Sequence, residues 1–440
     1  MKTLKTLECR TAGIAAAVLV SLGLAGCAGS ITSSTLPGSV SVYHFSGSVH
    51  GGQQPISGAA IGLYAASKAG YSGGTSNILT STVTTDAQGS FDVGTTFSCT
   101  AGQQMYLTAT GGNPGAGTNA NAALLATLGD CANLGNIPFV SVNEVTTVGG
   151  VFALAPFMSS PTNVGTSSTN TAGLARAFAS VNKLVNITNG SSTGSALPAN
   201  ATGPVLAVNT LANILAACIN STGGVASNTG TACGQLFNLT TPPAGAAPTN
   251  TIQAALNIAQ NPTLNVGSLF NTAPPASPFL PMLINAPTDF ALGIQYANVG
   301  LQTPKSATVD GTGQVWFANS GNNTLTVLAQ TGTPIAGSPI SGNSLSGPVA
   351  VAIDATGNAW VANNAGQSLS VFTPTGAASA NYTGAGLLSG PTALAFDGSG
   401  NVFVVNSPGN SLVELNSAGS ALGSTTTGIP SPTAIAINPK

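Results

Sequence analysis

Residues 348–363 read PVAVAIDATGNAWVAN, and this stretch decides the fold. Apolar residues alternate with small ones on both sides of the central DATG, as in two half-buried strands joined by a tight turn. Related stretches begin at Pro304 and Pro391, and a shorter one begins at Pro432. Counting from Pro304, the steps between the opening prolines are 44, 43 and 41 residues. A period of just over 40 residues indicates a repeat architecture.

Each copy of the repeat has room for four strands. In the second copy we predict a third strand over 367–372 and a fourth after the turn at 374–376. Four-stranded sheets repeated at this period are typical of β-propeller blades. We therefore predict that residues 290–440 form a partial propeller, with three full blades and the first strand of a fourth over 432–438.

The repeat resembles NHL-type blades, which also occur in the virginiamycin-lyase-like group. The resemblance rests on a D-x-x-G turn followed by an aromatic residue and Ala-Asn. In the second copy these are Asp354, Gly357, Trp360 and Asn363. Catalysis in the lyase family depends on a histidine of the propeller, and residues 290–440 contain none. The resemblance therefore implies the fold and argues against lyase activity.

The number of blades leaves three alternatives open, because a closed ring needs about four to eight blades. In the first, residues 290–296 pair with the final strand and make a reduced fourth blade. In the second, the blades form an open arc whose edges another chain covers, for example by self-association. In the third, which we favour, the reading frame is truncated, since the sequence stops directly after a predicted strand.

The N-terminus is typical of an export signal. A basic start precedes an apolar stretch over 12–24. The next residues, LAGC at 24–27, resemble the bacterial lipoprotein box. This resemblance implies cleavage before Cys27 and acylation of its thiol and amine, which would hold the protein at a membrane. We expect a signal peptide over 1–26 and a flexible tether over 27–41.

The residue after the cysteine indicates the membrane at which a lipoprotein is held. Ala28 follows Cys27, where an aspartate would imply retention at the inner membrane. The lipoprotein resemblance thus implies a lipid-anchored protein of the cell envelope, at the outer membrane. The alternative is an ordinary secretory signal that ends beside a chance cysteine.

Four cysteines remain after the first two are assigned to the signal and the lipid. They are Cys99, Cys131, Cys218 and Cys233. In an oxidising compartment an even number indicates disulfides. Three connectivities are open, and we favour pairing of sequence neighbours because each bridge then stays within one region. We predict no metal site, since no C-x-x-C pair and no nearby histidine supports one.

Two further regions precede the repeat, so the fold class is mainly β with a helical middle region. Residues 42–141 carry a G-x-V, P-x-x-G-A, T-D-x-x-G-x-F series and resemble the carboxypeptidase-regulatory-like, prealbumin-type β-sandwich. From 142 to 273 apolar residues recur at helical steps of three and four, which predicts a small helical module. A Pro-rich linker over 274–289 closes that module.

The composition narrows the classes of function. Only 4% of the residues are charged, and the formal net charge is −2. Without a basic patch, nucleic-acid binding is disfavoured. Past Cys27 no apolar run reaches the roughly 20 residues of a membrane span, so the expected membrane contact is the N-terminal lipid.

The sequence offers no catalytic constellation. His44 and His50 lie about 20 Å apart if both belong to one strand, and each is interpreted as a surface residue. Asp310, Asp354 and Asp397 occupy equivalent turns, where an Asx-type cap explains them. We predict no catalytic residue and no cofactor.

Three asparagines form the candidate binding site. Asn319, Asn363 and Asn406 end the second strand of each copy, three residues after Trp316, Trp360 and Phe403 respectively. Converging amides could line a shallow polar site for a glycan, a peptide or protein, or a cation. The alternative is structural, with each asparagine starting a turn and each aromatic residue packed between blades.

We accordingly predict a non-enzymatic envelope lipoprotein that presents a propeller-type surface for binding or scaffolding. Two other classes stay open at this point. One is a lyase or hydrolase that uses a metal at the propeller axis, and the other is a structural surface or adhesion protein.

Overall fold

The computed structural model describes residues 44–71, 73–94 and 97–438. The predicted signal peptide over 1–26 and the predicted tether over 27–41, which begins with Cys27, lie outside these residues. Strand makes up 29% of the chain and helix 19%, which confirms the mainly β class. In the described part of the chain, no helix combines the length and the apolar character needed to cross a bilayer.

The first sheet is built around β1 (Phe45–Gly51). Strand β1 pairs antiparallel with β2 (Gln54–Pro55) and β5 (Ser90–Val93), and parallel with β8 (Phe139–Val142). Its residues alternate between buried and half-buried, so only one face of β1 meets the core. Gly47 pairs with Phe91 of β5 and with Val140 of β8, and a Cβ at this position would meet the Val140 carbonyl oxygen at 2.3 Å.

The second sheet is covered on both faces. Its order is β4 (Val83–Thr84), β3 (Ala60–Ala65), β6 (Gln104–Thr110) and β7 (Ala123–Asp130). Six successive residues are buried in β6 and six in β7. These strands do not alternate between buried and exposed residues, because helices cover the face that would otherwise be solvated.

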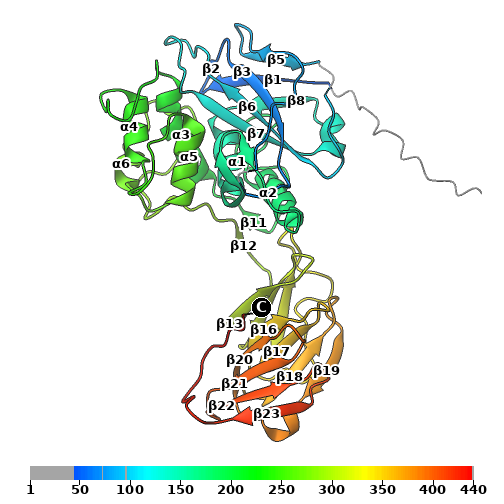
Figure 1. The fold of residues 1–440 in the computed structure, drawn as a ribbon. Coiled ribbons are helices and arrows are strands. Elements are labelled where there is room, and N and C mark those ends of the chain that lie inside the picture. Colours follow the sequence, from blue (N-terminus) through cyan, green and yellow to red (C-terminus); the bar gives the residue numbers. More distant parts are fainter. Residues whose placement is uncertain (1–43, 72, 95–96, 439–440) are drawn as a thin grey trace, which may run out of the picture. The chain divides into compact units, whose positions relative to one another are not determined.

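Six helices follow between residues 144 and 270. Figure 1 shows α1, α2 and α5 beside β7. Helix α1 begins with a capping box, in which Asn143 accepts from the Thr146 N–H and Thr146 Oγ1 accepts from the Asn143 N–H. The helices are α1 (Glu144–Leu154), α2 (Thr171–Leu184), α3 (Val205–Ile219), α4 (Ala232–Leu239), α5 (Thr251–Gln260) and α6 (Val266–Phe270).

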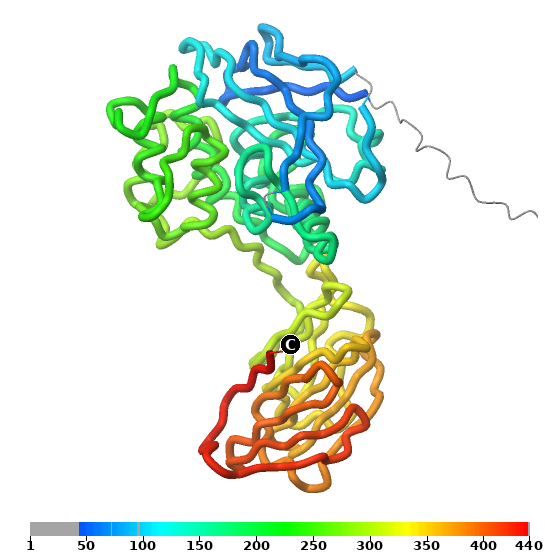
Figure 2. Tube along the Cα trace, viewed as in Figure 1, coloured from blue at the N-terminus to red at the C-terminus, as the bar shows by residue number. Residues whose placement is uncertain are grey.

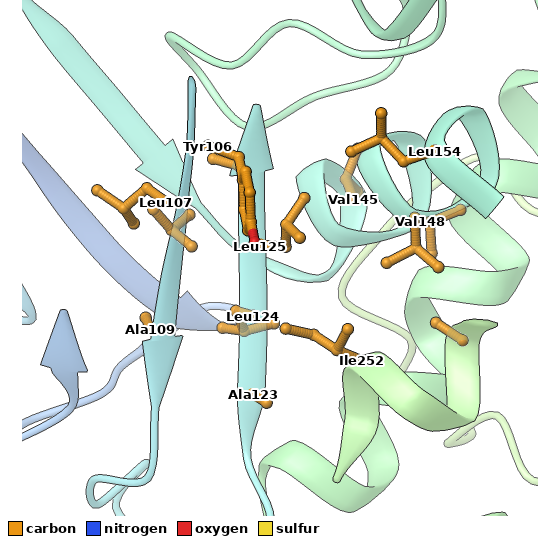
Figure 3. Close-up of a cluster of buried hydrophobic side chains, with 14 of the residues drawn as sticks. Tyr106, Leu107, Ala109, Ala123, Leu124, Leu125, Val145, Val148, Leu154 and Ile252 are labelled. Carbon is orange, nitrogen blue, oxygen red and sulfur yellow. The ribbon is translucent and has the colours of Figure 1, made fainter. Parts of the chain in front are cut away.

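Helices and sheets share one core. Figure 3 shows Leu124 and Leu125 of β7 beside Val145 and Val148 of α1 and Ile252 of α5. All five side chains are fully buried or nearly so. From the sequence we predicted residues 142–273 as a separate helical module. The structure differs, because the helical apolar stripes pack on the second sheet and bury its outer face.

Both disulfides follow the favoured pairing of sequence neighbours. Cys99 bonds to Cys131, at the start of a short 3₁₀ helix (Cys131–Asn136) that follows β7. Cys218 of α3 bonds to Cys233 of α4. This confirms the predicted bridges. The second one joins two helices across a loop rich in glycine, serine and threonine, where few apolar contacts hold the chain.

Shorter pieces connect these elements. The predicted partner of the last strand, residues 290–296, contributes β12 instead to a small pair with β11. The first alternative for a fourth blade is therefore wrong. The connecting elements are a second 3₁₀ helix (Ala155–Phe157), β9 (Met158–Ser160), β10 (Asn163–Val164), β11 (Ala201–Thr202) and β12 (Gln295–Tyr296).

The repeat folds into three antiparallel sheets, each with its strands in chain order (Figures 1 and 2). The first strands of successive sheets lie side by side. Tandem up-and-down sheets of this kind make a propeller-like array. The strands are β13 (Pro304–Val309), β14 (Val315–Asn319) and β15 (Thr324–Leu328) in the first sheet, β16 (Pro348–Ile353), β17 (Ala359–Asn363), β18 (Ser368–Phe372) and β19 (Ala378–Tyr382) in the second, and β20 (Pro391–Phe396), β21 (Val402–Asn406), β22 (Ser411–Leu415) and β23 (Ala421–Thr425) in the third.

The first sheet has three regular strands where four were predicted. The segment that corresponds to β19 forms only isolated bridges, at Pro334 and Ile340, along the edge of β15. Pro334 and Pro339 have no N–H to donate to a strand ladder, so this copy cannot complete its fourth strand.

The strand predicted over 432–438 is also absent, since these described residues join no ladder. The backbone nonetheless repeats the start of a sheet. The residues before the four opening prolines all have positive φ, with Thr303 at 48°, Gly347 at 58°, Gly390 at 64° and Ser431 at 46°. The segment therefore begins as the fourth copy of the repeat.

Candidate functional site

Each copy of the repeat is organised by an aspartate in its first turn. In the second copy, Asp354 Oδ1 accepts from the Thr356 and Asn358 N–H groups, and Oδ2 accepts from Trp360 Nε1 at 2.9 Å. Asp310 bonds in the same way to Trp316 Nε1 at 3.0 Å. The predicted Asx-type turns are thus confirmed, with an additional bond to the indole that the sequence analysis missed.

These hydrogen bonds also set the ionisation of the aspartates. Burial opposes ionisation of Asp354, but bonds from Thr356, Trp360 and Asn358 outweigh it and lower the pKa of the carboxyl below its ordinary value. The same balance lowers the pKa of Asp310. Each carboxylate is therefore charged at neutral pH and saturated by its own turn.

The two tryptophans of the motif pack within and between sheets. The Trp360 ring stacks on Tyr382 of its own sheet, with centroids 5.3 Å apart. It also meets the edge of Phe396 from the third sheet, at 5.7 Å. Trp316 is fully buried between the first and second sheets. These rings are consequently part of the core.

The three candidate asparagines are fully buried. In the second sheet, Asn363 Oδ1 accepts from the Ser346 N–H at 3.2 Å. Its Nδ2 donates to the hydroxyls of Ser368 and Ser370. Asn319 and Asn406 make the corresponding bonds in their own sheets. The geometry favours the structural alternative, and ligand binding by these residues stays a prediction.

The two histidines differ in environment. The His44 ring lies 3.1 Å from Asp92 on the surface, with 66% of its side chain exposed. His50 is half-buried in β1 and lines a polar cavity together with Ser48 and Ser141. Burial lowers the pKa of His50 below its ordinary value. The interpretation of His50 as a plain surface residue is therefore wrong.

A buried carboxyl lies near this cavity. Glu144, the first residue of α1, is fully buried, and both its oxygens lie within 3.0 Å of the Gly52 nitrogen. Burial raises its pKa to about 8, against hydrogen bonds that lower it. The carboxyl is therefore mostly protonated at pH 7. Sequence reasoning missed this group, because a glutamate in a first helical turn is usually solvated.

Within residues 44–71, 73–94 and 97–438, no three histidine, cysteine, aspartate or glutamate side chains gather as a metal site would require. Cys27, the predicted lipidation residue, lies outside the described part of the chain, so this prediction rests on the sequence alone.

Comparison with known proteins finds only partial structural similarity. No family model matches the sequence, and no curated protein matches it either. A streptogramin B lyase structure aligns with 31% of this chain and 45% of its own, at 15% identity and a TM-score of 0.27. Virginiamycin B lyase from Staphylococcus aureus aligns with 30% and 44%, at 18% identity and a TM-score of 0.27.

A protein of unknown function from Bacteroides caccae aligns with 33% of this chain and 53% of its own, at 15% identity and a TM-score of 0.27. The chain thus spans about half the length of these three solved structures. Alignments of this extent carry no assignment of activity.

Proposed function

We propose that the chain is a cell-envelope lipoprotein, anchored through acylated Cys27 at the outer membrane, that presents its propeller-like sheets as a non-enzymatic binding and scaffolding surface. The export signal and the LAGC sequence support the anchor. The single observation that supports the surface is that, within the described residues, the first and third sheets each share an apolar cluster with the middle sheet and with no other sheet.

We also propose the finer architecture. The sheets around β1 and β6 would correspond to the carboxypeptidase-regulatory-like sandwich, with helices added on its outer face. The sheets of residues 304–425 would be three NHL-type blades. The repeated D-x-x-G, aromatic and Ala-Asn series supports this second correspondence.

The outer face of the first sheet is apolar and accessible. Because side chains alternate along a strand, Trp316 faces the middle sheet while its neighbours Val315 and Phe317 face away from it. Opposite them on β13 lie Val309 and Ala307. Val309 is 58% exposed, and Val315 and Phe317 are half-buried.

The third sheet has a comparable outer face. Val402 and Val404 point into the cluster with the middle sheet. The alternate residue Phe403 faces away, paired with Ala395 on β20 and Glu414 on β22. All three are half-buried. Two sheet faces thus lack the apolar cover that the middle sheet has.

The partner we propose for these faces is a second copy of the chain. If the first sheet of one copy stacks on the third sheet of the other, a two-fold pair brings together six sheets. That number lies within the range of about four to eight blades of closed propellers. The pair would bury both apolar faces at once.

Sedimentation of the exported chain tests this proposal, with Cys27→Ala present so that lipid cannot cause association. We expect a dimer at micromolar concentration. Val309→Asp should give a monomer, because it places a charge on the outer face. Ala355→Asp, in an exposed turn of the middle sheet, should stay dimeric. A monomeric parent chain, or a Val309→Asp dimer, would contradict the proposed surface.

A further inference from the structure

A second site lies apart from the repeat, and its assignment is independent of the proposed function. A cavity of about 500 Å³ opens on the half-buried face of the first sheet. Its walls come from β1, β8, the start of α1, the loop at 188–192, α3 and residues 278–280. The volume is within the range of small-molecule sites, about 300–1,000 Å³.

The floor of the cavity is a set of aligned side chains. Strands β1 and β8 run parallel, and Ser48 lies opposite Ser141 in their register. His50 follows Ser48 by two residues and Phe139 precedes Ser141 by two, so all four share a face. Figure 1 shows the two strands as neighbours.

Three groups of this floor are available to a ligand. In the described part of the chain, the Ser48 and Ser141 hydroxyls and the His50 ring have no hydrogen-bond partner. Hydroxyl and imidazole groups that line a polar cavity without partners are donors and acceptors for a bound molecule. They therefore distinguish this cavity from the asparagines of the repeat, whose bonds are all made within the chain.

The rim of the cavity is held in place by amide hydrogen bonds. Asn143 Nδ2 donates to the Gly190 carbonyl at 2.8 Å, which ties the loop at 188–192 to the start of α1. Ser192 Oγ donates to Asn209 Oδ1 at 2.9 Å, and Asn209 Nδ2 donates to the Pro281 carbonyl at 2.8 Å. A rim fixed in advance lowers the entropy cost of binding.

The cavity is uncharged at neutral pH. His50 is the only residue of its lining that can titrate near neutrality, and burial keeps the pKa of its ring below the ordinary value. A phosphate or carboxylate ligand would need a cation to balance its charge, and the lining includes no lysine or arginine. Anionic ligands are thus disfavoured.

Two phenyl rings complete the lining. Phe139 is 38% exposed and Phe279 is half-buried. Apolar ring faces beside neutral hydroxyl and amide groups match a sugar, which has C–H faces and hydroxyl edges. We propose that this cavity binds a neutral carbohydrate, such as the end of a glycan, with Ser48, Ser141 and His50 hydrogen-bonded to its hydroxyls.

Calorimetry and saturation-transfer NMR on the full exported chain test the site. The probes are the neutral disaccharides maltose, cellobiose and N,N′-diacetylchitobiose, with glucose 6-phosphate as the charged counterpart. We expect at least one neutral disaccharide to bind and to exceed glucose 6-phosphate in affinity by tenfold or more.

Variants then locate the binding. Ser141→Val and Ser48→Val should each weaken the disaccharide at least tenfold, because they remove a hydroxyl and leave ligand groups unpaired. Ser76→Val, at an exposed serine outside the cavity, should bind as the parent does. Thermal melts establish that each variant is folded. If a valine variant does not fold, His50→Gln takes its place in the binding test. Absence of binding by all three disaccharides, tighter binding of glucose 6-phosphate, or binding unchanged in the folded cavity variants would overturn the proposal.

Discussion

At the scale of single residues, the buried asparagines of the repeat act as links between successive segments. Asn363 joins the segment before β16 to β17 and β18 through its bonds with the Ser346 N–H and the Ser368 and Ser370 hydroxyls. A buried donor that loses its acceptor keeps the full cost of desolvation. The sequence placed these residues at equivalent strand ends but could not show that their amides are already satisfied.

Asn363→Ala should therefore lower the free energy of unfolding by about 1–3 kcal/mol. Both tryptophans of the chain lie in the sheets of the repeat, so urea titration followed by tryptophan fluorescence reports on this region. Gln302→Ala, at an exposed residue of the same region whose side chain makes no hydrogen bond in the described part of the chain, should change stability by less than about 0.5 kcal/mol. Equal losses in the two variants would argue against the linking role.

Glu144 makes stability depend on pH. Its pKa is raised to about 8 in the folded state by burial, against 4.5 for the ordinary group. Between these values the folded chain holds a proton that the unfolded chain has released, so the free energy of unfolding falls as pH rises from 5 to 8. The full contribution of Glu144 to the free energy of unfolding is present below the pKa that its carboxyl has in the unfolded chain.

Glu144→Gln should remove this dependence, because the amide stays neutral and its oxygen can still accept from the Gly52 N–H. Urea titration by circular dichroism at pH 5.5 and 7.5 measures the effect. As pH rises, the free energy of unfolding of the parent should fall by about 1 kcal/mol per pH unit more than that of the variant. Parallel pH profiles would mean that the carboxyl is not protonated in the folded state.

At the scale of elements, the position of β1 between two strands depends on a residue without a side chain. A Cβ on Gly47 would lie 2.3 Å from the Val140 carbonyl oxygen and 2.4 Å from the Phe91 ring. Backbone cannot yield as a flexible side chain can, so β8 would have to move away from β1.

Gly47→Ala should cost about 1–3 kcal/mol of stability or more, as overpacking does. Gly74→Ala is the matched control, since a Cβ there meets nothing within 4 Å and its φ is not in the left-handed region. Thermal unfolding of the two variants compares them directly. If Gly47→Ala unfolds at the same temperature as Gly74→Ala, β1 and β8 are not packed as described.

The elements differ in how far the sequence could predict them. The repeated pattern of apolar residues identified the strands of the second and third copies, because equivalent residues of each copy fill the apolar clusters between the sheets. It failed for the fourth strand of the first copy, where Pro334 and Pro339 interrupt the ladder. It also failed to show that the helices cover β6 and β7, since periodicity shows that a face is apolar but not which surface covers it.

At the scale of the whole molecule, the two candidate sites were predictable to different degrees. The apolar outer faces of the first and third sheets could be predicted once the number of sheets was known, because the alternation of residues along each strand shows which side chains point outward. The carbohydrate cavity could not, because its lining extends from Ser48 to Leu280 and only the folded chain brings these segments together. Cavities assembled from distant loops leave no local motif.

In the function proposed above, lipid on Cys27 holds these surfaces at a membrane. Metabolic labelling with radioactive palmitate in a bacterial host, followed by separation of membranes from soluble proteins, tests this anchor directly. We expect the parent chain to be labelled and found in the membrane fraction, and Cys27→Ala to be unlabelled and soluble. A parent chain without label in the soluble fraction would contradict the proposed anchor.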